Sequence, residues 1–343
     1  MDLSSHKVLR LNAELFPITP FEQQKYDEQG ITVAAVEVRS REELLVAVQD
    51  ADAVMVVSEA LPAQVVRAMR RCRVICRLGA GTDKIDVAAA TDCGIVVANV
   101  PDFCAAEQAD HAMALLLAVA RRLTPLRRQM LDGRYDDARR DCRHLRRLSE
   151  CALGLVGFGL SAKEMARRAA GFGMRVLATR RNLSLDDPDV SALGVQLVPL
   201  ETLLQQADFV SLHLPLDDDT RNLFDKPLLM KMKPGSVLIN TSRGAIVDEG
   251  ALVDVLRGGQ LAGAGIDTFA AIDVHRSGRE APRHPLLEME NVIFTPHVAA
   301  FSVDSSRDVG YGSVANLIAV LSGHWPPPNR IVNPEVQPRE PLR

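Results

Sequence analysis

Short apolar segments alternate with amphipathic helical patterns along almost the whole chain, and this alternation limits the possible folds more than any other feature. The first series of strand-length segments is VLRLN, ITVAAVEV, DAVMVV, RVICRLG and IVVAN, with helical patterns such as SREELLVAVQD and LPAQVVRAMRR between them. A second series runs from CALGLVGFG through MRVLATR, VQLVP, DFVSLHL, SVLIN, AGAGID and NVIFT. Strands that alternate with helices form parallel sheets covered by helices. The sequence therefore predicts an α/β fold with two doubly wound parallel-sheet units.

The length and charge of the chain agree with this prediction. A chain of 343 residues fits two domains of roughly 150 residues each better than one core. Its net charge of -4 gives no basic footprint for nucleic acid or an anionic membrane. No apolar run approaches the roughly 20 residues of a membrane span, and the first residues lack the apolar core of a secretory signal. We therefore expect a cytoplasmic protein that binds neither nucleic acid nor membrane.

Three other segments allow more limited predictions. Cys72 and Cys76 have no second cysteine or histidine pair nearby, so we expect structural thiols and no metal site. The arginine-dense residues 121–150 follow a long predicted helix over 105–122 and contain several acids, which favours a solvated or oligomer-facing segment over a phosphate-binding patch. The proline-rich C-terminus predicts a frayed tail beyond about residue 335.

A glycine motif opens the second series. Gly157, Gly159 and Ala162 form a G-x-G-x-x-A pattern between a predicted strand and an amphipathic helix. The first glycine permits a tight turn, the second lets the backbone approach a pyrophosphate, and the alanine lets the helix pack closely. Free N–H groups at the start of such a helix bind phosphate. The pattern predicts a dinucleotide site, with a purely structural glycine turn as the alternative.

The residues after the next predicted strand select between cofactors. About 20 positions after the glycines, an acidic residue would bind the adenosine ribose hydroxyls of NAD(H) and repel a 2′-phosphate. Thr179, Arg180 and Arg181 stand there instead, and no carboxylate competes for the ribose. Guanidinium groups bind phosphate through two hydrogen bonds at once. We therefore expect NADP(H) to be preferred and NAD(H) to be possible, unless both arginines point into solvent.

Five motifs in order carry a resemblance to a known family. They are RLGAGTDKIDVAAATDCGIVVANVPDF, the glycine motif, FVSLHLPLDDDTRNLF, MKPGSVLINTSRGAIVDEGALVDVLRGGQLAGAGIDTF and NVIFTPHVAAFS. With these motifs the chain resembles the D-isomer-specific 2-hydroxyacid dehydrogenases, in a branch near phosphoglycerate dehydrogenase and bacterial carboxyl-terminal-binding-protein-like members. The resemblance implies a Rossmann NAD(P)-binding domain (105–298) inserted into a flavodoxin-like substrate domain (1–104 and 299–343). It also implies a homodimer formed largely through the nucleotide domain.

The resemblance further implies the residues of an active site. Arg243 in the SRG motif and His297 in the TPH motif match the family's catalytic pair, and the backbone amides of Ala80 and Gly81 would receive the substrate carboxylate. Asp267 matches the residue that contacts the nicotinamide carboxamide. The other cofactor-lining positions, besides the glycines and the two arginines, are Leu160, Ser161, Pro215, Thr220, Thr241 and Ser242.

The chemistry of 2-oxo acid reduction suits these residue types. The planar fork of Arg243 can hold a carboxylate and polarise the keto oxygen. The nicotinamide supplies a hydride to C2. His297, at the end of a predicted strand, is the expected general acid in reduction and general base in oxidation. His111 and His213 lack such a motif, and we expect them to pack or form hydrogen bonds.

One carboxylate of the family pattern is missing from its usual place. A carboxylate beside the catalytic histidine raises the pKa of the ring above about 6.5 and fixes its orientation. In the family it lies five residues after the aspartate matched by Asp267, and Ile272 stands there. Asp273 is the expected substitute and Glu280 the second candidate, while the alternative is that Asp273 is a solvent-facing turn residue.

Two other functions stay open at this point. A nucleotide-sensing interaction protein like the carboxyl-terminal-binding proteins would report cofactor state to partners, although it would not need both Arg243 and His297. A dehydrogenase of an unusual acid such as a phosphonate is the other alternative, in which the arginine-rich segment 121–150 would line the cleft.

Overall fold

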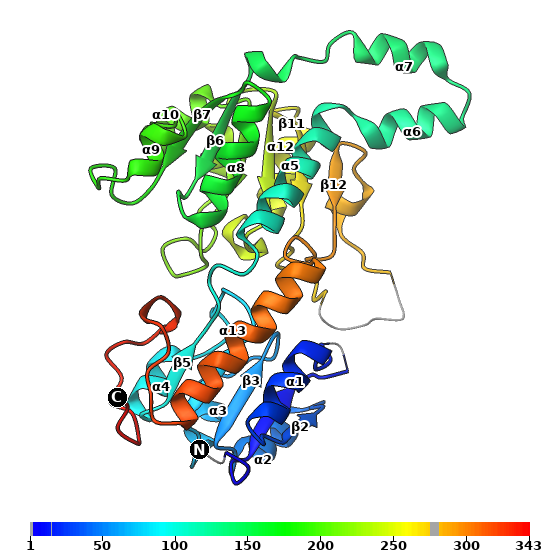
Figure 1. Cartoon of the computed structure of the whole chain (residues 1–343). Helices are drawn as coiled ribbons and strands as arrows, with labels where there is room; N and C mark the ends of the chain where they lie inside the picture. The colour runs from blue at the N-terminus through cyan, green and yellow to red at the C-terminus, as the bar shows by residue number, and fades with distance from the viewer. Residues whose placement is uncertain (1–2, 15, 275–280) are drawn as a thin grey trace. The chain divides into compact units, whose positions relative to one another are not determined.

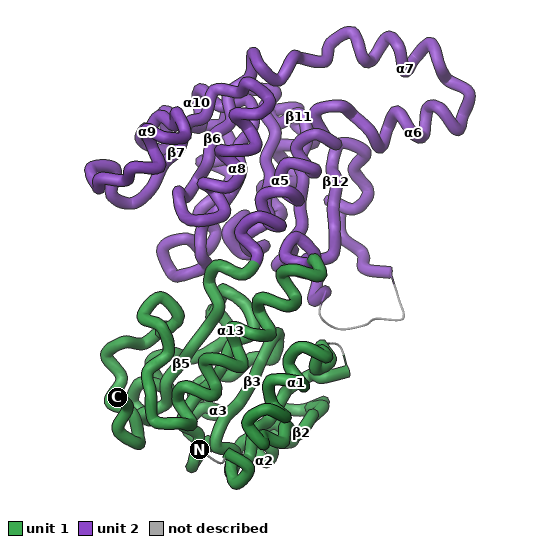
Figure 2. The backbone as a smooth tube through the Cα atoms, in the orientation of Figure 1, with its two compact units in different colours: residues 1–103, 302–343 green, residues 104–301 purple. Residues whose placement is uncertain are grey.

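The chain folds into two compact units, each built around one parallel sheet. In the computed structural model, which describes residues 3–14, 16–274 and 281–343, unit 1 comprises residues 1–103 and 302–343 and unit 2 residues 104–301 (Figure 2). Every apolar segment predicted as a strand contains one, and the predicted long helix is present (Figure 1). The predicted fold class is therefore confirmed.

Unit 1 has a five-stranded sheet in the order β2-β1-β3-β4-β5, with every neighbouring pair parallel. This order is that of flavodoxin-like folds. Its strands are β1 (Val8–Leu11), β2 (Val33–Val36), β3 (Ala53–Val56), β4 (Val74–Arg77) and β5 (Val96–Ala98). Its helices are α1 (Pro20–Glu28), α2 (Arg41–Val48), α3 (Ala63–Ala68), α4 (Val87–Asp92), α13 (Val303–Leu321) and the 3-10 turn η4 (Pro328–Arg330).

Apolar layers cover both faces of the unit 1 sheet. Leu44, Val65 and Ala90 from α2, α3 and α4 lie in the core on one face. On the other face, Tyr26 of α1 and Leu317 of α13 are fully buried. A strand covered on both faces is mostly apolar along its length, which explains why most strand segments of the sequence are apolar runs, with the buried Arg10 of β1 as an exception.

The C-terminal residues of unit 1 are tied to the rest of the unit, so the prediction of a frayed tail is wrong. The backbone N–H of Arg339 donates to Gly94, 3.0 Å away, and the N–H of Arg343 donates to Gly323 at 2.9 Å. Both side-chain ends of Asn333 are bonded, because its oxygen accepts from Val97 at 2.8 Å and its nitrogen donates to the Ile95 carbonyl at 3.0 Å. Proline content alone does not reveal these bonds.

Unit 2 has a seven-stranded sheet in the order β12-β11-β10-β9-β6-β7-β8, again with parallel pairs. Read from its first strand β6, this is the strand order of a Rossmann fold with one further strand. The strands are β6 (Ala152–Val156), β7 (Arg175–Thr179), β8 (Gln196–Leu197), β9 (Phe209–Leu212), β10 (Ser236–Asn240), β11 (Leu261–Ile266) and β12 (Val292–Phe294).

Helices cover both faces of this sheet as well. On one face lie α5 (Ala105–Ala120) and α8 (Leu160–Gly171). The other face is covered by α10 (Leu200–Gln206), α11 (Lys226–Met230) and α12 (Glu249–Arg257). The remaining elements are α6 (Leu123–Leu131), α7 (Tyr135–Cys142), α9 (Pro188–Ala192) and the 3-10 turns η1 (Leu148–Glu150), η2 (Gly244–Ile246) and η3 (Pro285–Glu288).

Helices α6 and α7 form an arm that extends away from the sheet of unit 2 (Figure 1). Its arginines pair with acids on the same segment or beside it, as in Arg134–Asp132 at 2.9 Å and Arg139–Asp136 at 3.0 Å. This pattern agrees with the predicted solvated or oligomer-facing segment. Within the described residues, no helix combines the length and apolar character needed to cross a membrane.

Candidate functional site

The predicted site residues of unit 2 lie where its strands end. All seven strands are parallel, so the residues that follow them lie along one edge of the sheet. The glycine turn follows β6 and the two arginines follow β7. Thr241 to Arg243 follow β10, and His297 follows β12. In open α/β sheets, ligands bind outside the carboxyl ends of the strands.

The glycine turn has the geometry that a dinucleotide requires. Gly157 has a φ of +91°, and a Cβ there would lie 2.4 Å from the His213 carbonyl oxygen, so only glycine fits. Gly159 caps α8, and a Cβ on it would meet no described atom within 4 Å. Ala162 is fully buried against the sheet. Since no side chain caps α8, the N–H groups of its first turn, including those of Leu160 and Ser161, fit a diphosphate.

His213 supports this turn through two serines. Its Nδ1 lies 3.0 Å from the Ser161 hydroxyl and its Nε2 lies 2.9 Å from the Ser211 hydroxyl. Burial lowers the pKa of His213 from about 6.5 to about 4, so the ring is neutral at physiological pH. A neutral ring can donate to one serine and accept from the other. The prediction that His213 forms hydrogen bonds is confirmed.

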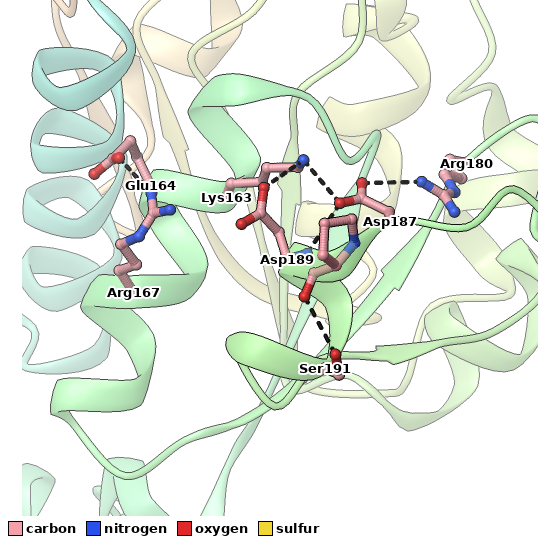
Figure 3. A network of polar contacts seen from close by, with 8 residues as sticks. Lys163, Glu164, Arg167, Arg180, Asp187, Asp189 and Ser191 are labelled. Carbon is pink, nitrogen blue, oxygen red and sulfur yellow. Dashed lines mark hydrogen bonds and ion pairs between the residues drawn. The ribbon is translucent and has the colours of Figure 1, made fainter.

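The two arginines after β7 are both paired with carboxylates. Arg180 Nη1 lies 3.1 Å from Asp187 Oδ2, while Arg181 Nη2 lies 3.0 Å from Asp219 Oδ2 (Figure 3 shows the Arg180 pair). Arg181 is exposed, whereas only 13% of the Arg180 side chain is. The sequence has no carboxylate at residues 179–181, but the fold brings one, Asp187, beside Arg180. Asp187 comes from the start of α9, and sequence spacing alone does not place it beside Arg180.

A tight turn after β9 holds Pro215 and Thr220. The hydroxyl of Thr220 donates to the Pro215 carbonyl at 2.7 Å, and its backbone N–H donates to Asp217 Oδ1 at 2.9 Å. Thr220 is buried and Pro215 is exposed. The proline therefore lies on the outer side of the turn, at the same edge as the glycines.

Thr241, Ser242 and Arg243 follow β10 in a closely packed loop. The Ser242 hydroxyl donates to the Leu212 carbonyl at 2.6 Å, and Arg243 Nη1 donates to the Ser242 carbonyl at 2.9 Å. A Cβ on Gly244 would lie 2.2 Å from the Phe269 carbonyl carbon, so this glycine permits close approach of the loop after β11. Thr241 Oγ1 is buried, and among the described residues it has no hydrogen-bond partner. Such an atom is available to a ligand.

Asp267 organises the loop that carries His297. Its fully buried carboxylate accepts hydrogen bonds from the Thr295 hydroxyl at 2.5 Å and from the backbone N–H groups of Val298 and Ala299, both at 2.9 Å. The His297 N–H donates to the Asp267 carbonyl at 2.7 Å. Asp267 thus connects the ends of β11 and β12, a role that its family match did not suggest.

Two histidines lie near this carboxylate with different roles. His111 Nε2 lies 2.8 Å from the Thr295 hydroxyl and 3.5 Å from Asp267 Oδ1, so its predicted hydrogen-bonding role is confirmed. His297 is half-buried and has a φ of +57°. A left-handed backbone at a residue other than glycine costs about 1 to 3 kcal/mol and is concentrated at functional sites.

The loop after β11 contains the two positions in question for the missing carboxylate. Ile272 is half-buried and Asp273 is exposed. Glu280 lies outside the described residues. The exposure of Asp273 is that expected for a turn residue, and its role beside His297 stays a prediction.

A carboxylate–histidine pair that the sequence reasoning missed holds this loop. Glu249, at the start of α12, accepts from the N–H groups of Ala270 at 2.6 Å and Ala271 at 3.3 Å. It also pairs with His284 Nε2 at 3.1 Å, and only 11% of either side chain is exposed. His284 Nδ1 accepts from the Leu286 N–H at 3.2 Å. The sequence carries no signal for this pair, because Glu249 and His284 are distant in the chain and meet only through the fold.

Ala80 and Gly81 belong to unit 1, where they follow β4. Both are half-buried, and the carbonyl of Ala80 accepts from Asn99 Nδ2 at 2.6 Å. Their N–H groups therefore lie at the carboxyl edge of the unit 1 sheet, which is the edge expected for a ligand.

The two cysteines near β4 are buried thiols. Burial raises the pKa of Cys72, just before the strand, to about 12, and it also raises the pKa of Cys76, within the strand, as expected for structural cysteines.

Comparisons with known sequences give consistent results. A family model described as D-isomer specific 2-hydroxyacid dehydrogenase, NAD binding domain, matches residues 113–299. The chain is 38% identical over 299 residues to a glyoxylate reductase of Korarchaeum cryptofilum, and the alignment covers 87% of each protein. It is 34% identical over 319 residues to a D-3-phosphoglycerate dehydrogenase of Archaeoglobus fulgidus, covering 91% of this chain but 57% of that protein.

Solved structures with the same architecture are also known. A Thermus thermophilus protein superposes with a TM-score of 0.81 at 33% identity, covering 95% of this chain and 99% of that one. An acyclic imino acid reductase in complex with NADPH and D-Arg superposes with a TM-score of 0.79 at 25% identity, covering 95% and 100%. Both similarities extend over nearly the whole chain.

Proposed function

The chain belongs to the D-isomer specific 2-hydroxyacid dehydrogenase family, and from this membership we propose that it reduces a small 2-oxo acid with NADPH. The observation that carries the proposal is the shared edge of the unit 2 sheet, where the glycine turn, Arg243 and His297 all follow parallel strands. A relative at 38% identity is named a glyoxylate reductase, which supports a 2-oxo acid of that size.

The unit 2 residues have separate roles in the proposed mechanism. The N–H groups at the start of α8 bind the diphosphate, and the unpartnered Thr241 hydroxyl contributes a further polar contact. The bound nicotinamide supplies the hydride. Arg243 binds the substrate carboxylate and polarises the C2 carbonyl through its planar guanidinium. Asp267 keeps the His297 loop in place through its bonds to Val298 and Ala299.

His297 performs the proton transfer in this proposal. Its protonated ring donates to the oxygen on C2 as negative charge develops there, and in the reverse reaction the neutral ring removes that proton. In unit 1, the N–H groups of Ala80 and Gly81 receive the substrate carboxylate. Asp273 is the proposed carboxylate that favours the protonated ring.

NADP(H) is the proposed preferred cofactor, with NAD(H) as an alternative. Arg180 and Arg181 follow β7, where the adenosine ribose is expected. A structural neighbour that binds NADPH supports a cofactor of this class.

The proposal also includes a homodimer. The arm of α6 and α7 exposes four large apolar side chains that a second copy could cover, namely Leu123, Met130, Leu131 and Tyr135.

Turnover measurements with both cofactors test the proposed function directly. Nicotinamide absorbance would be followed with NADPH or NADH against glyoxylate, hydroxypyruvate and other 2-oxo acids between about pH 5 and about pH 8. We expect turnover of at least one acid, faster with NADPH than with NADH. Cofactor binding without turnover of any acid would instead favour the nucleotide-sensing interaction protein.

A further inference from the structure

Two basic and two acidic side chains meet beside the glycine turn. Lys163 in α8 pairs with Asp187 Oδ1 at 3.0 Å and with Asp189 Oδ2 at 2.7 Å. The second oxygen of Asp187 lies 3.1 Å from Arg180 Nη1 (Figure 3). Asp187 thus bridges a base from the first turns of α8 and a base from the end of β7. We call these four residues the Asp187 network.

Three of the four side chains of the network are largely shielded from water, and its formal charges cancel. The exposed fractions of the side chains are 19% for Lys163, 13% for Arg180, 12% for Asp187 and 38% for Asp189. Hydrogen bonding to Asp189 raises the pKa of Lys163, and hydrogen bonding to Lys163 lowers the pKa of Asp187. Both directions favour the charged forms of Lys163 and Asp187 near neutral pH.

The network lies where the adenosine ribose of a dinucleotide is expected. The Gly157 N–H donates to the Thr179 carbonyl at 3.0 Å, so Arg180 is the first residue beyond a bond that joins the glycine turn to β7. Ribose recognition in this fold occurs at the end of that second strand. Arg180 Nε is buried, and within the described part of the chain it has no hydrogen-bond partner. Arg180 Nη2 donates to the Leu185 carbonyl oxygen, so Nη1, which is bonded to Asp187, is the group for which a phosphate oxygen would compete.

We propose that Asp187 sets cofactor selectivity by competing with the 2′-phosphate of NADP(H) for Lys163 and Arg180. The inference rests on the proposed use of a nicotinamide dinucleotide. A phosphate monoester carries about -1.5 to -2 charges at pH 7, more than a carboxylate, so it can replace Asp187 as the partner of both bases. The 2′-hydroxyl of NAD(H) is uncharged and cannot replace it. Lys163 therefore joins Arg180 as a cation that recognises the phosphate.

Arg181 has a smaller part in this selectivity. Its side chain is 78% exposed and pairs with Asp219, whose side chain is 79% exposed. Exposed ion pairs are screened by water and salt and contribute little. Discrimination between the cofactors therefore depends mainly on the shielded Asp187 network.

The Asp187→Asn variant tests the proposal with little disturbance of the fold. The Asp187 side chain caps α9 by accepting from the Asp189 N–H at 3.1 Å, and asparagine is an equally good cap. Binding of NADPH and NADH would be titrated by fluorescence with the full chain. We expect the Kd for NADPH to fall by at least about 10-fold while that for NADH changes by less than about 3-fold, because only the phosphate gains freed cations.

Two further variants separate competition from general electrostatics. Lys163→Met should weaken NADPH binding by about 10-fold or more and leave NADH binding nearly unchanged. The matched control is Asp189→Asn, because Asp189 contacts Lys163 but not Arg180. This variant should change the ratio of the Kd for NADPH to the Kd for NADH less than Asp187→Asn does. The wild-type affinity for NADPH should also fall more steeply with salt than that for NADH.

The outcomes distinguish this inference from the proposed function. Suppose that the wild type binds both nucleotides. If Asp187→Asn then raises the affinity for both by the same factor, or for neither, Asp187 does not compete with the phosphate. Equal loss of both nucleotides in Lys163→Met would also overturn the inference and leave the proposed function standing. If the wild type binds neither nucleotide, both proposals are wrong.

Discussion

His297 combines a strained backbone with a position in a well-held loop. Its φ of +57° is unfavourable for most residues, yet the Asp267 carboxylate fixes the two N–H groups that follow it. Backbone strain persists only where the surrounding structure overdetermines the conformation. The fully buried Asp267 therefore contributes to the site by fixing the loop that carries His297.

Replacing His297 by asparagine separates proton transfer from binding. Asparagine tolerates the left-handed backbone, so His297→Asn should keep the loop and remove only the titrating ring. Loss of a general acid typically costs roughly 100-fold to 10,000-fold in rate, and we expect a fall in kcat of that size with unchanged NADPH affinity. The exposed His144→Asn is the control. A kcat within about 10-fold of the wild type would remove His297 from proton transfer.

The Asp273 question can be answered from a pH–rate profile. If Asp273 stabilises the protonated ring, Asp273→Asn lowers the pKa of His297 and moves the alkaline limb of 2-oxo acid reduction to lower pH. The rate at neutral pH should then fall several-fold. Asp136→Asn on the arm, whose side chain is 91% exposed, serves as the control. A profile that superposes on the wild type would assign Asp273 to the solvent-facing turn.

The neutral state of His213 makes a prediction about stability. Its pKa is lowered to about 4 by burial, whereas the unfolded chain has a value near 6.5. The unfolded state therefore binds more protons between these values, and stability falls as pH drops from about 7 to about 5, by about 2 kcal/mol at pH 5. His213→Gln should lose this dependence in urea unfolding at the two pH values, unlike the control His144→Gln. Equal pH dependence of wild type and His213→Gln would show that the ring does not cause it.

At the scale of elements, α12 controls the loop after β11. Glu249 is the first residue of this helix, and its carboxylate accepts from Ala270 and Ala271 while it pairs with His284. Hydrogen bonds to a charged acceptor contribute about 1.5 to 3 kcal/mol each, more than neutral ones. The segment that contains Ile272 and Asp273 is thus attached to the rest of unit 2 on its N-terminal side.

Neutralising Glu249 should loosen that loop. We expect Glu249→Gln to reduce the free energy of unfolding by about 1 kcal/mol and to lower kcat more than NADPH affinity, because the glycine turn is untouched. Denaturant midpoints and kinetics would measure both effects. The exposed Glu288→Gln in η3 is the matched control. Unchanged kcat with reduced stability would make the pair purely structural.

Several element-scale features were accessible from the sequence, and others were not. Strands could be predicted because parallel strands covered on both faces are mostly apolar. Gly157 could be predicted because its motif marks a turn that admits no Cβ. The pairing of Arg180 with Asp187 could not be predicted, because the two residues meet only through the fold of the β7–α9 connection. Asp267 was assigned by its motif to the cofactor, whereas its bonds to Val298 and Ala299 depend on how β11 and β12 pair.

At the scale of the whole molecule, the arm of α6 and α7 is the feature that a single chain does not explain. Leu131 is 70% exposed and Met130 is 64% exposed, although both lie in a helix that could have buried them. Burial of apolar side chains between two copies would contribute roughly 25 cal/mol for each Å². In the proposed homodimer, the second copy would cover this apolar surface of the arm.

Mass measurement in solution tests the role of the arm. We expect the wild type to have the mass of a dimer and Leu131→Glu to shift toward the monomer, because a buried unpaired charge is strongly unfavourable at an interface. Light scattering coupled to size exclusion would measure both. Val46→Glu is the control, since Val46 is 71% exposed in α2 of unit 1. A monomeric wild type, or a Leu131→Glu protein that stays dimeric, would exclude the arm as the interface.

The insertion of unit 2 into unit 1 also sets an order of events during synthesis. The strands of unit 1 leave the ribosome first, but Leu317 and Val320 of α13, which cover one face of their sheet, follow only after all of unit 2. At roughly 5 to 20 residues per second, the delay between Ala98 and Leu321 is roughly 10 to 45 s. Until α13 is made, that face of the nascent sheet is covered only in part, by α1, so we expect unit 1 to be the part of the chain that most needs protection from aggregation during synthesis.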